Sequence, residues 1–410
     1  MKNFWDQFPG RKALDDQIPE LPEETIFDVN AHMHTPFSFS AFESVDDAVR
    51  LGVQQNVRIV GVNDFYTTAG YASWADACMK YKAFPLFNIE FIGLSKSNQD
   101  NNIRINDPNN PGRIYISGKG LSYPFRIEEP FKTQLENLTT ESNQHVGLMC
   151  DQLNTYLADR GITISLNFGS IMQTHTKGLI RERHLAKVLR EKVFESRPDE
   201  KGRKLLLQDI YGRKDVSADL NNHAALENEI RNKLLKAGGP AFIPENPDSF
   251  LSIEAVRELI LRGGGIPTYP LLADDKNGNF TEFEQNKQQL ANELKQRGIY
   301  SIEFITTRNS PEVLEEYATW FVKNGFVITF GSEHNTPDLT PISLYTRDGA
   351  PLNNTLRKIN YDGACLIAAH QYLIAQEGIG YLDADGHPND EKTNKYISLG
   401  NKLIRYFLRN

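Results

Sequence analysis

The stretch Ile26-Phe27-Asp28-Val29-Asn30-Ala31 leads directly into His32-Met33-His34, and this short segment decides how the chain is interpreted. If residues 26–31 form a strand, the twofold alternation of side chains places both imidazoles on the same face. Two ring nitrogens on one face at a strand end can bind one metal ion. The alternative is that the His-x-His pair arises by chance and points both rings at solvent, because short motifs often occur without function.

Three further apolar runs end in acidic residues. Each run is short and rich in β-branched or aromatic residues, which is typical of a buried strand. The runs cover residues 57–63 before Asp64, residues 84–89 before Glu90, and residues 326–332 before Glu333 and His334. Because the ends of successive strands in a parallel barrel meet at the active face, we expect these side chains to converge with the two histidines.

Helical patterns alternate with the apolar runs, which indicates βαβ units and an α/β protein with a parallel sheet or barrel. After the first run, Ser44 resembles a helix N-cap, and Asp47 occupies the capping-box position three residues later. Further helices are predicted over residues 73–81, 251–262, 283–297, 310–323, 353–378 and 392–408. Further strands are predicted over residues 114–116, 266–270 and 299–305.

We expect five segments along the chain. Residues 1–25 are charged, carry three prolines and are expected to form an extended lead-in. Residues 131–250 are strongly polar and mostly helical in pattern. Since tight barrel connections are only a few residues long, ~100 residues here predict a helical insertion beside the barrel mouth. The first part of the barrel is expected at 26–130, the second part at 251–345, and C-terminal helices at 346–410.

The composition is that of a soluble globular protein, with 40% hydrophobic and 24% charged residues among 410. The net charge of −8 disfavours a stable nucleic-acid complex, which usually needs a basic surface. Three widely spaced cysteines predict neither a zinc site nor a disulfide framework, which favours a reducing compartment. The N-terminus lacks the apolar core of a signal peptide, and no apolar run is long enough to span a bilayer. We therefore expect a cytoplasmic protein without a membrane partner, and leave its oligomeric state open.

Taken in order, these residues resemble the polymerase and histidinol phosphatase (PHP) family of metal-dependent phosphoesterases, over residues 26–94 and 180–340. The family's opening His-x-His-Thr is matched by His32-Met33-His34-Thr35, and its strand ending in Glu is matched by Ile89-Glu90. Other motifs are matched in part: Asn63-Asp64-Phe65 for Thr-Asp-His, Glu182-Arg183-His184-Leu185-Ala186 for Arg-Pro-His-Ile-Ala, residues 264–270 for a Gly-Gly strand ending Ala-His-Pro, and Gly331-Ser332-Glu333-His334-Asn335 for Gly-Ser-Asp-x-His. The likeness, closest to the subgroup acting on nucleotides or short oligonucleotides, implies a distorted (β/α)7 TIM-like barrel with a helical insertion.

The chain departs from the family pattern at several ligand positions. Phe65 and Tyr269 replace histidines, Tyr115 replaces another, and Asn335 stands where the last histidine is expected. Because Phe cannot ligate a metal and Tyr or Asn are poor ligands for these ions, the two or three metals common in the family are not expected. The resemblance instead implies one divalent ion, Zn, Mn or Fe, with an open position for water. Its expected ligands are His32, His34, Glu90 and Glu333.

The same resemblance suggests catalytic and substrate-binding roles for other side chains. Asp64 could orient the water or act as a general base, and His334 is a second catalytic candidate. A candidate phosphate clamp consists of Arg181, Arg183 and His184, although a charge run of this kind is also typical of a solvated helix face.

Three more residues are candidates near the barrel mouth. Arg308 could hold an anionic substrate or pair with a surface acid. Tyr269 and Tyr115 could donate hydrogen bonds to a substrate oxyanion, or only fill the space left by the missing histidines.

Three functions compete on this reading. The first is a metal-dependent hydrolase, most simply a phosphoesterase that cleaves a small phosphorylated or nucleotide-like substrate through a metal-activated water. The second is a mononuclear metal enzyme on the same barrel that acts on a non-phosphate substrate. The third is a non-catalytic binding module with a vestigial site. Because the first two require a bound metal and the third does not, metal content separates them, and we favour the first with a small anionic substrate.

Overall fold

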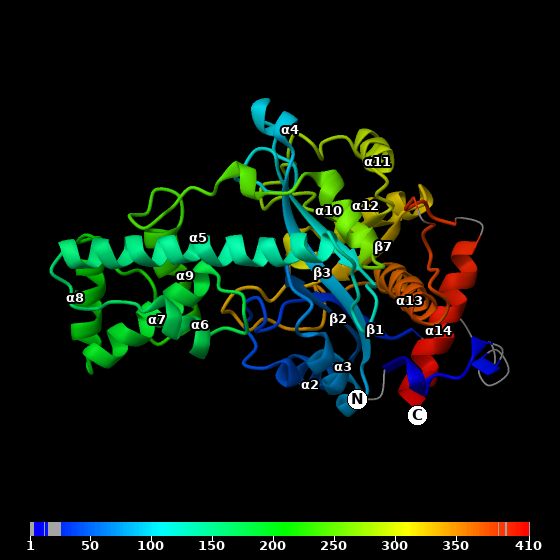
Figure 1. The fold of residues 1–410 in the computed structure, drawn as a ribbon, viewed down its shortest axis with the longest axis horizontal. Helices are drawn as coiled ribbons and strands as arrows, with labels where there is room; N and C mark the ends of the chain where they lie inside the picture. The colour runs from blue at the N-terminus through cyan, green and yellow to red at the C-terminus, as the bar shows by residue number, and fades with distance from the viewer. Residues whose placement is uncertain (1–3, 12, 15–25, 384, 390–391, 410) are drawn as a thin grey trace.

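The computed structural model of the chain describes residues 4–11, 13–14, 26–383, 385–389 and 392–409. Its centre is a seven-stranded sheet whose strands follow one another in chain order. The strands are β1 (Asp28–Met33), β2 (Val57–Phe65), β3 (Phe84–Leu94), β4 (Arg113–Lys119), β5 (Ile266–Leu271), β6 (Ser301–Ile305) and β7 (Val327–Gly331). A parallel bridge between Met33 and Glu333 brings β1 beside β7, so the sheet nearly closes. The expected α/β, (β/α)7 TIM-like barrel is confirmed (Figure 1).

One strand of the barrel runs against its neighbours. β4 pairs antiparallel with both β3 and β5, whereas the other neighbouring pairs are parallel. The connection from β3 to β4 contains only the five-residue helix α4 (Lys96–Asp100), and antiparallel strands need no helical crossover. The parallel arrangement that the alternating pattern predicts is therefore wrong at β4.

Helices surround the barrel as the alternation predicts. They are α2 (Val45–Gln54), α3 (Tyr71–Tyr81), α10 (Ile253–Arg262), α11 (Lys287–Gln296) and α12 (Pro311–Lys323). Ser44 is the N-cap of α2, and its side chain accepts a hydrogen bond from the backbone N–H of Asp47, which confirms the predicted start of that helix. The buried face of α2 includes Ala48 and Val49, which belong to the barrel's hydrophobic core.

Two C-terminal helices follow, α13 (Asn354–Glu377) and α14 (Thr393–Arg409). α13 covers the side of the barrel where β1 meets β7, and α14 packs against α13 (Figure 1). Asn360 on α13 donates to the carbonyl of Val29 in β1 and accepts from the N–H of Phe330 in β7. This single amide therefore satisfies backbone groups at the place where the barrel's own pairing is incomplete. The first described element, the 3-10 helix η1 (Phe4–Gln7), buries its aromatic rings here, while much of the predicted lead-in at 1–25 lies outside the described residues.

A second hydrophobic cluster lies beside the barrel. It is formed by α5 (Phe131–Asp159), α6 (Phe168–Thr174), α7 (Glu182–Ser196), α8 (Glu200–Ile210), α9 (His223–Ile230) and the π-helical turn η2 (Arg231–Leu235). α5 joins the two cores, since Leu135 and Leu138 near its start pack in the barrel core while Leu153 and Leu157 near its end pack in the second cluster. Figure 1 shows α5 running from the barrel out to α7 and α8. The boundaries 131–250 proposed for this insertion stay a prediction.

Within the parts of the chain that the structure describes, no helix combines the length and the apolar character that crossing a bilayer requires.

Candidate metal centre

Three buried side chains meet inside the barrel mouth. His32 is the second-to-last residue of β1, and His34 directly follows the strand. Glu90 lies on β3, where it pairs with Phe65, the last residue of β2. The two Nε2 atoms are 3.1 Å apart, and Glu90 Oε2 is 3.2 Å from Nε2 of His34 and 3.8 Å from Nε2 of His32. The structure therefore brings together three of the four predicted metal ligands, His32, His34 and Glu90.

Neighbouring groups decide which ring nitrogen of each histidine carries the proton. Nδ1 of His32 lies 2.7 Å from Oε2 of Glu303, and a carboxylate only accepts, so Nδ1 of His32 is protonated. Nδ1 of His34 lies 3.1 Å from Oγ of Ser38, whose hydroxyl donates to Asp64 at 2.6 Å. Ser38 must therefore accept from Nδ1–H of His34. In both rings the lone pair is left on Nε2, which is the tautomer that binds a metal.

The triad has the donor set and spacing of a site for one ion. Two Nε2 lone pairs face a carboxylate oxygen, and Glu90 Oε2 is buried without a hydrogen-bond partner among the described residues. Ligand atoms about 2.0–2.1 Å from a tetrahedral metal lie about 3.3 Å from one another, which is close to the observed separations. The residues present thus fit one divalent ion such as zinc, manganese or iron.

The electrostatics of the triad agree with that donor set. Burial lowers the pKa of His34 to about 4, so the ring is neutral near pH 7 and its contact with Glu90 is not an ion pair. Burial raises the pKa of Glu90 to about 8, because no solvent and few donors compensate its charge. A bound cation would supply the missing compensation.

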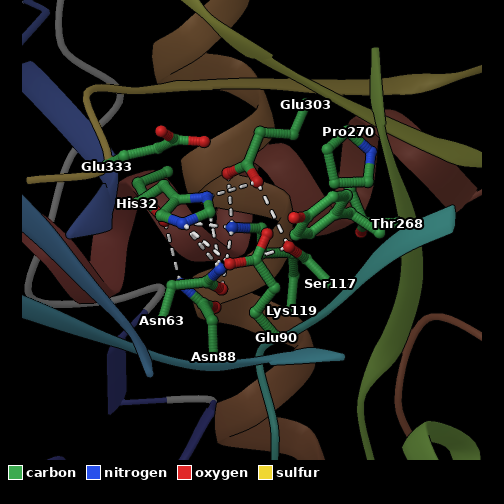
Figure 2. A network of polar contacts seen from close by, with 12 residues as sticks. His32, Asn63, Asn88, Glu90, Ser117, Lys119, Thr268, Pro270, Glu303 and Glu333 are labelled. Atoms are coloured by element: carbon green, nitrogen blue, oxygen red, sulfur yellow. Dashed lines mark hydrogen bonds and ion pairs between the residues drawn. The ribbon is translucent and has the colours of Figure 1, made fainter. Parts of the chain in front are cut away.

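Behind His32, polar side chains of β2, β4 and β6 form a buried network (Figure 2). Glu303 on β6 forms an ion pair with Lys119 on β4 through its second oxygen, Oε1. Ser117 donates to Glu303 at 3.3 Å, and Lys119 donates to Oδ1 of Asn63 at 3.2 Å. Burial opposes the ionisation of Glu303, but His32 and Lys119 outweigh it and hold the pKa of Glu303 at about 2. Glu303 is therefore a charged acceptor for Nδ1–H of His32.

The amide of Asn63 does not compete for the lone pair of His32. Its Nδ2 lies 3.2 Å from Nδ1 and 3.0 Å from Nε2 of that ring. An atom nearly equidistant from both nitrogens cannot lie on the lone-pair axis of either one, so the amide does not hydrogen-bond Nε2 in line. The Nε2 lone pair thus stays directed at the triad.

Asp64, predicted as a water-orienting group or base, lies behind His34. It accepts from the N–H and Oγ1–H of Thr35, at 2.7 and 2.6 Å, and from Ser38. These contacts hold the loop after β1 in place. Because Ser38 donates to Asp64, its oxygen is oriented to accept from Nδ1–H of His34. The geometry favours a role for Asp64 in positioning His34 over a role as the base.

The backbone at Glu333 and His334 does not continue the regular conformation of β7, so the directions of the two side chains cannot be taken from the alternation of a strand. Both adopt left-handed backbone conformations, with φ of 66° and 58°. Glu333 lines the cavity over the mouth and accepts from Arg308 at 2.7 Å. His334 instead has both nitrogens engaged, by Ser332 at 2.7 Å and by the carbonyl of Thr340 at 2.9 Å, and its ring stacks on Phe42. The predicted catalytic group His334 is thus held in a structural network.

Arg181, a predicted substrate-binding residue, is linked to the triad through an aromatic ring. Its guanidinium lies 4.8 Å from the ring centre of Phe65, and that ring stacks on His34 with centres 4.8 Å apart. Arg183 lies over Phe39 and donates to Asn228 at 2.9 Å. Arg181 and Arg183 therefore form part of the cavity wall opposite the barrel.

The other two candidates have structural contacts. His184 accepts from the N–H of Arg181 at 2.9 Å, in the capping box that begins α7, and burial lowers its pKa to about 3. Tyr269, a residue of β5, donates to Glu284 at 2.7 Å and is fully buried. Neither side chain is among those lining the cavity, in contrast to Tyr115.

The mouth opens into a cavity of about 1620 Å³ between the barrel and the helices of the second cluster. Its walls include Glu90, Phe65, Tyr115, Arg181, Arg308 and Glu333. The sequence by itself assigns no role to Ser117 or Lys119, whereas the position of Glu303 allows it either to face the barrel mouth or to cap a helix. The available signal was the alternation in β4, where the polar residues Ser117 and Lys119 follow the run Ile114-Tyr115-Ile116 and are two positions apart.

Comparisons with known proteins identify the fold and not the chemistry. No family model matches the chain, and no curated protein matches it. Among solved structures, a protein provisionally described as a metal-dependent phosphoesterase, from Bifidobacterium adolescentis, is similar at 14% identity with a TM-score of 0.51, covering 81% of this chain and 95% of its own. An amidohydrolase from Chromobacterium violaceum, solved with bound sulfate and no metal, is similar at 17% identity with a TM-score of 0.46, covering 77% and 93%. At these identities, the first likeness supports the barrel fold alone.

Proposed function

We propose that the protein is a metal-dependent hydrolase that cleaves a phosphoester in a small anionic substrate. The observation that carries this proposal is the convergence of two Nε2 lone pairs and an uncompensated carboxylate oxygen in the barrel mouth. We infer one divalent ion, zinc, manganese or iron, held by His32, His34 and Glu90. Glu333, the fourth predicted ligand, lies at the cavity wall with Arg308 and remains a candidate for that position.

A bound divalent ion would supply Lewis acidity and lower the pKa of water toward neutrality. The chain supplies the remaining functions. Glu303 and Ser38 keep the protons of His32 and His34 on Nδ1. Arg181 and Arg308 line the same cavity, and guanidinium groups form paired hydrogen bonds with phosphate oxygens. Burial raises the pKa of Tyr115 to about 12, so its hydroxyl stays protonated and can donate to a substrate oxygen.

A second candidate is hydrolysis of a non-phosphate substrate on the same centre. The observation that favours it is the aromatic wall next to Glu90, formed by Phe39, Phe65, Tyr66 and Tyr115. Such a wall suits a planar or apolar substrate as well as it suits a nucleobase. Arg181 separates the two candidates, because only an anionic substrate depends on its charge.

Elemental analysis of protein purified without added metal tests the proposal. We expect about one equivalent of a divalent metal, the stoichiometry of a three-ligand site, and its loss in a His32→Ala, His34→Ala double variant. His223→Ala, which removes an exposed histidine of α9, serves as the matched control and should keep the metal. If the wild type neither contains nor takes up metal, both enzyme proposals are wrong and a binding module remains.

A phosphoester screen then tests the substrate class. Arg181→Met should raise KM for a phosphomonoester by about tenfold, as expected for a lost charge-assisted hydrogen bond, with a smaller effect on a neutral ester. Equal effects on both substrates, or hydrolysis of the neutral ester alone, would favour the second candidate.

A further inference from the structure

Lys119 is a fully buried lysine in the interior of the barrel. Its ammonium is surrounded by three oxygens, Oε1 of Glu303, Oδ1 of Asn63 and the carbonyl of Ala31. Removing an ammonium from water costs several kcal/mol unless charge and hydrogen bonds compensate it. An apolar side chain would fill the same space at lower cost, so packing alone does not account for a lysine here.

The two carboxylate oxygens of Glu303 have different partners. Oε1 faces Lys119, and Oε2 accepts from Nδ1–H of His32 at 2.7 Å (Figure 2). If the Lys119–Glu303 ion pair served only to join β4 and β6, the second oxygen of Glu303 would not need a histidine partner. That oxygen instead contacts His32, whose Nε2 points into the triad. The contacts from Lys119 to Glu303 and from Glu303 to His32 therefore connect the buried ammonium to the candidate metal position.

Lys119 also constrains which group Glu303 can present. An ammonium only donates, so whatever occupies position 303 must turn an acceptor toward it. With a carboxylate, the remaining oxygen is again an acceptor, and it fixes the proton of His32 on Nδ1. The neutral hydroxyl of Ser117, 3.3 Å from the same oxygen, cannot replace the positive charge.

We propose that Lys119 is a positioning residue for the metal centre: its ammonium holds Glu303 so that His32 keeps its proton on Nδ1 and presents Nε2 to the triad. The effect on metal affinity rests on the proposed function, whereas the effect on the tautomer does not. Loss of an outer partner of a metal-bound histidine typically weakens metal binding by about 10–100-fold.

The test uses two measurements on the full chain. Nitrogen-15 NMR of the metal-free protein reports the tautomer of His32, and titration with Zn²⁺ alone reports affinity. In the wild type we expect the Nδ1–H tautomer. In Lys119→Met, whose side chain is similar in length but uncharged, we expect a mixture of tautomers and a Zn²⁺ affinity lower by about tenfold or more. Gln371→Leu removes another fully buried polar residue, one that hydrogen-bonds the backbone of Pro85 and Phe87 in β3 and not Glu303 or His32, and should change neither measurement.

A second comparison tests the positioning role through the tautomer of His32, which the removal of a buried charge would not by itself change. In Glu303→Gln, Lys119 takes the amide oxygen, so the amide NH2 turns to His32 and forces the proton onto Nε2. Adding Lys119→Met frees that amide to rotate, and it removes a buried charge that lacks a counter-ion. We therefore expect the double variant to bind Zn²⁺ more tightly than Glu303→Gln alone, and to recover some Nδ1–H tautomer.

Each outcome decides the proposal. An unchanged tautomer and an unchanged affinity in Lys119→Met would overturn it, and so would a double variant that binds Zn²⁺ more weakly than Glu303→Gln. Should Lys119→Met fail to fold, the comparison with the double variant decides alone. If the wild type binds no Zn²⁺ while the tautomer still depends on Lys119, the proposed function fails and the positioning role stands.

Discussion

At the scale of single residues, the buried histidines of this protein fall into two kinds, those with both ring nitrogens hydrogen-bonded by protein groups and those with Nε2 left for another ligand. In His334 and His370 both nitrogens are engaged by protein groups. In His32 and His34 the neighbours engage Nδ1 and leave Nε2 facing a carboxylate. The first pair serves structure, and the second pair has the features of metal ligands.

His370 should make folding stability depend on pH. Its Nε2–H donates to the carbonyl of Gly264 and its Nδ1 accepts from the N–H of Tyr381, and burial lowers its pKa to about 4. The unfolded chain therefore takes up this proton first, so the contribution of His370 is present above pH 6.5 and is lost as pH falls toward 4. Between pH 7.5 and pH 5 the loss is about 2 kcal/mol.

Urea unfolding at both pH values, in the wild type and in His370→Gln, measures this contribution. The drop in unfolding free energy should be smaller in the variant by about that 2 kcal/mol, because glutamine does not titrate. An equal drop in both proteins would show that His370 is not neutral in the folded state.

Ser38 should control metal affinity without touching the metal. Ser38→Ala removes the acceptor for Nδ1–H of His34 and one donor to Asp64, so we expect Zn²⁺ affinity to fall by about tenfold. Ser40→Ala is the matched control, because its hydroxyl bonds the backbone carbonyl of His34 and not the ring. Calorimetric titration of both variants decides, and equal affinities would refute the role of Ser38.

The sequence could indicate which strand ends carry metal-binding groups but not how each ring is held. The triad follows from two apolar runs, one that leads into both histidines and one that leads into Glu90, because strand ends converge in a barrel. The contacts of His334 depend on two residues with left-handed backbone and on a loop carbonyl at Thr340, which no local pattern announces. Lys119 and Glu303 are 184 positions apart in the sequence, so their pairing exists only in the folded barrel.

At the scale of elements, close approach between α13 and α14 depends on one glycine. A Cβ at Gly400 would overlap the backbone carbonyl of Cys365 in α13, and backbone cannot move aside as a flexible side chain can. Gly147 in the middle of α5 differs, because its added Cβ would meet the ring of Phe168 at 3.6 Å, an ordinary contact distance.

The two glycines should therefore respond oppositely to alanine. Gly400→Ala should lower the unfolding free energy by about 1–3 kcal/mol, since α13 and α14 must separate. Gly147→Ala should raise it by about 0.5–1 kcal/mol, the ordinary preference for alanine inside a helix. Urea melts of both variants measure the pair, and a destabilised Gly147→Ala would contradict the packing described here.

Strands and helices were predictable where one pattern repeats over several residues. The apolar runs predicted the barrel strands, and Ser44 predicted the start of α2. The direction of β4 was not predictable from its composition, because an isolated apolar run reads the same in either direction. β4 runs antiparallel to β3, so no crossover helix is needed between them. This relation can be recognised only once it is known that the two strands pair.

At the scale of the whole molecule, metal binding should stabilise the folded chain. A ligand that binds only the folded state adds about 2.7 kcal/mol at a hundredfold excess over Kd. We expect Zn²⁺ to raise the unfolding free energy by that amount and a chelator to reverse it. The His32→Ala, His34→Ala double variant should show no response in the same urea titration, and an equal gain there would place the metal elsewhere.

The wide separation of His32 and Glu303 along the chain, 271 positions, has a consequence for biosynthesis. All three ligands of the triad leave the ribosome within the first 90 residues, long before the carboxylate that orients His32 has been translated. A nascent chain thus carries His32, His34 and Glu90 before the carboxylate that orients His32 exists. The orientation of His32 by Glu303 arises only when β6 joins the barrel, so we expect any metal to be loaded correctly only after residues 301–305 have been synthesised.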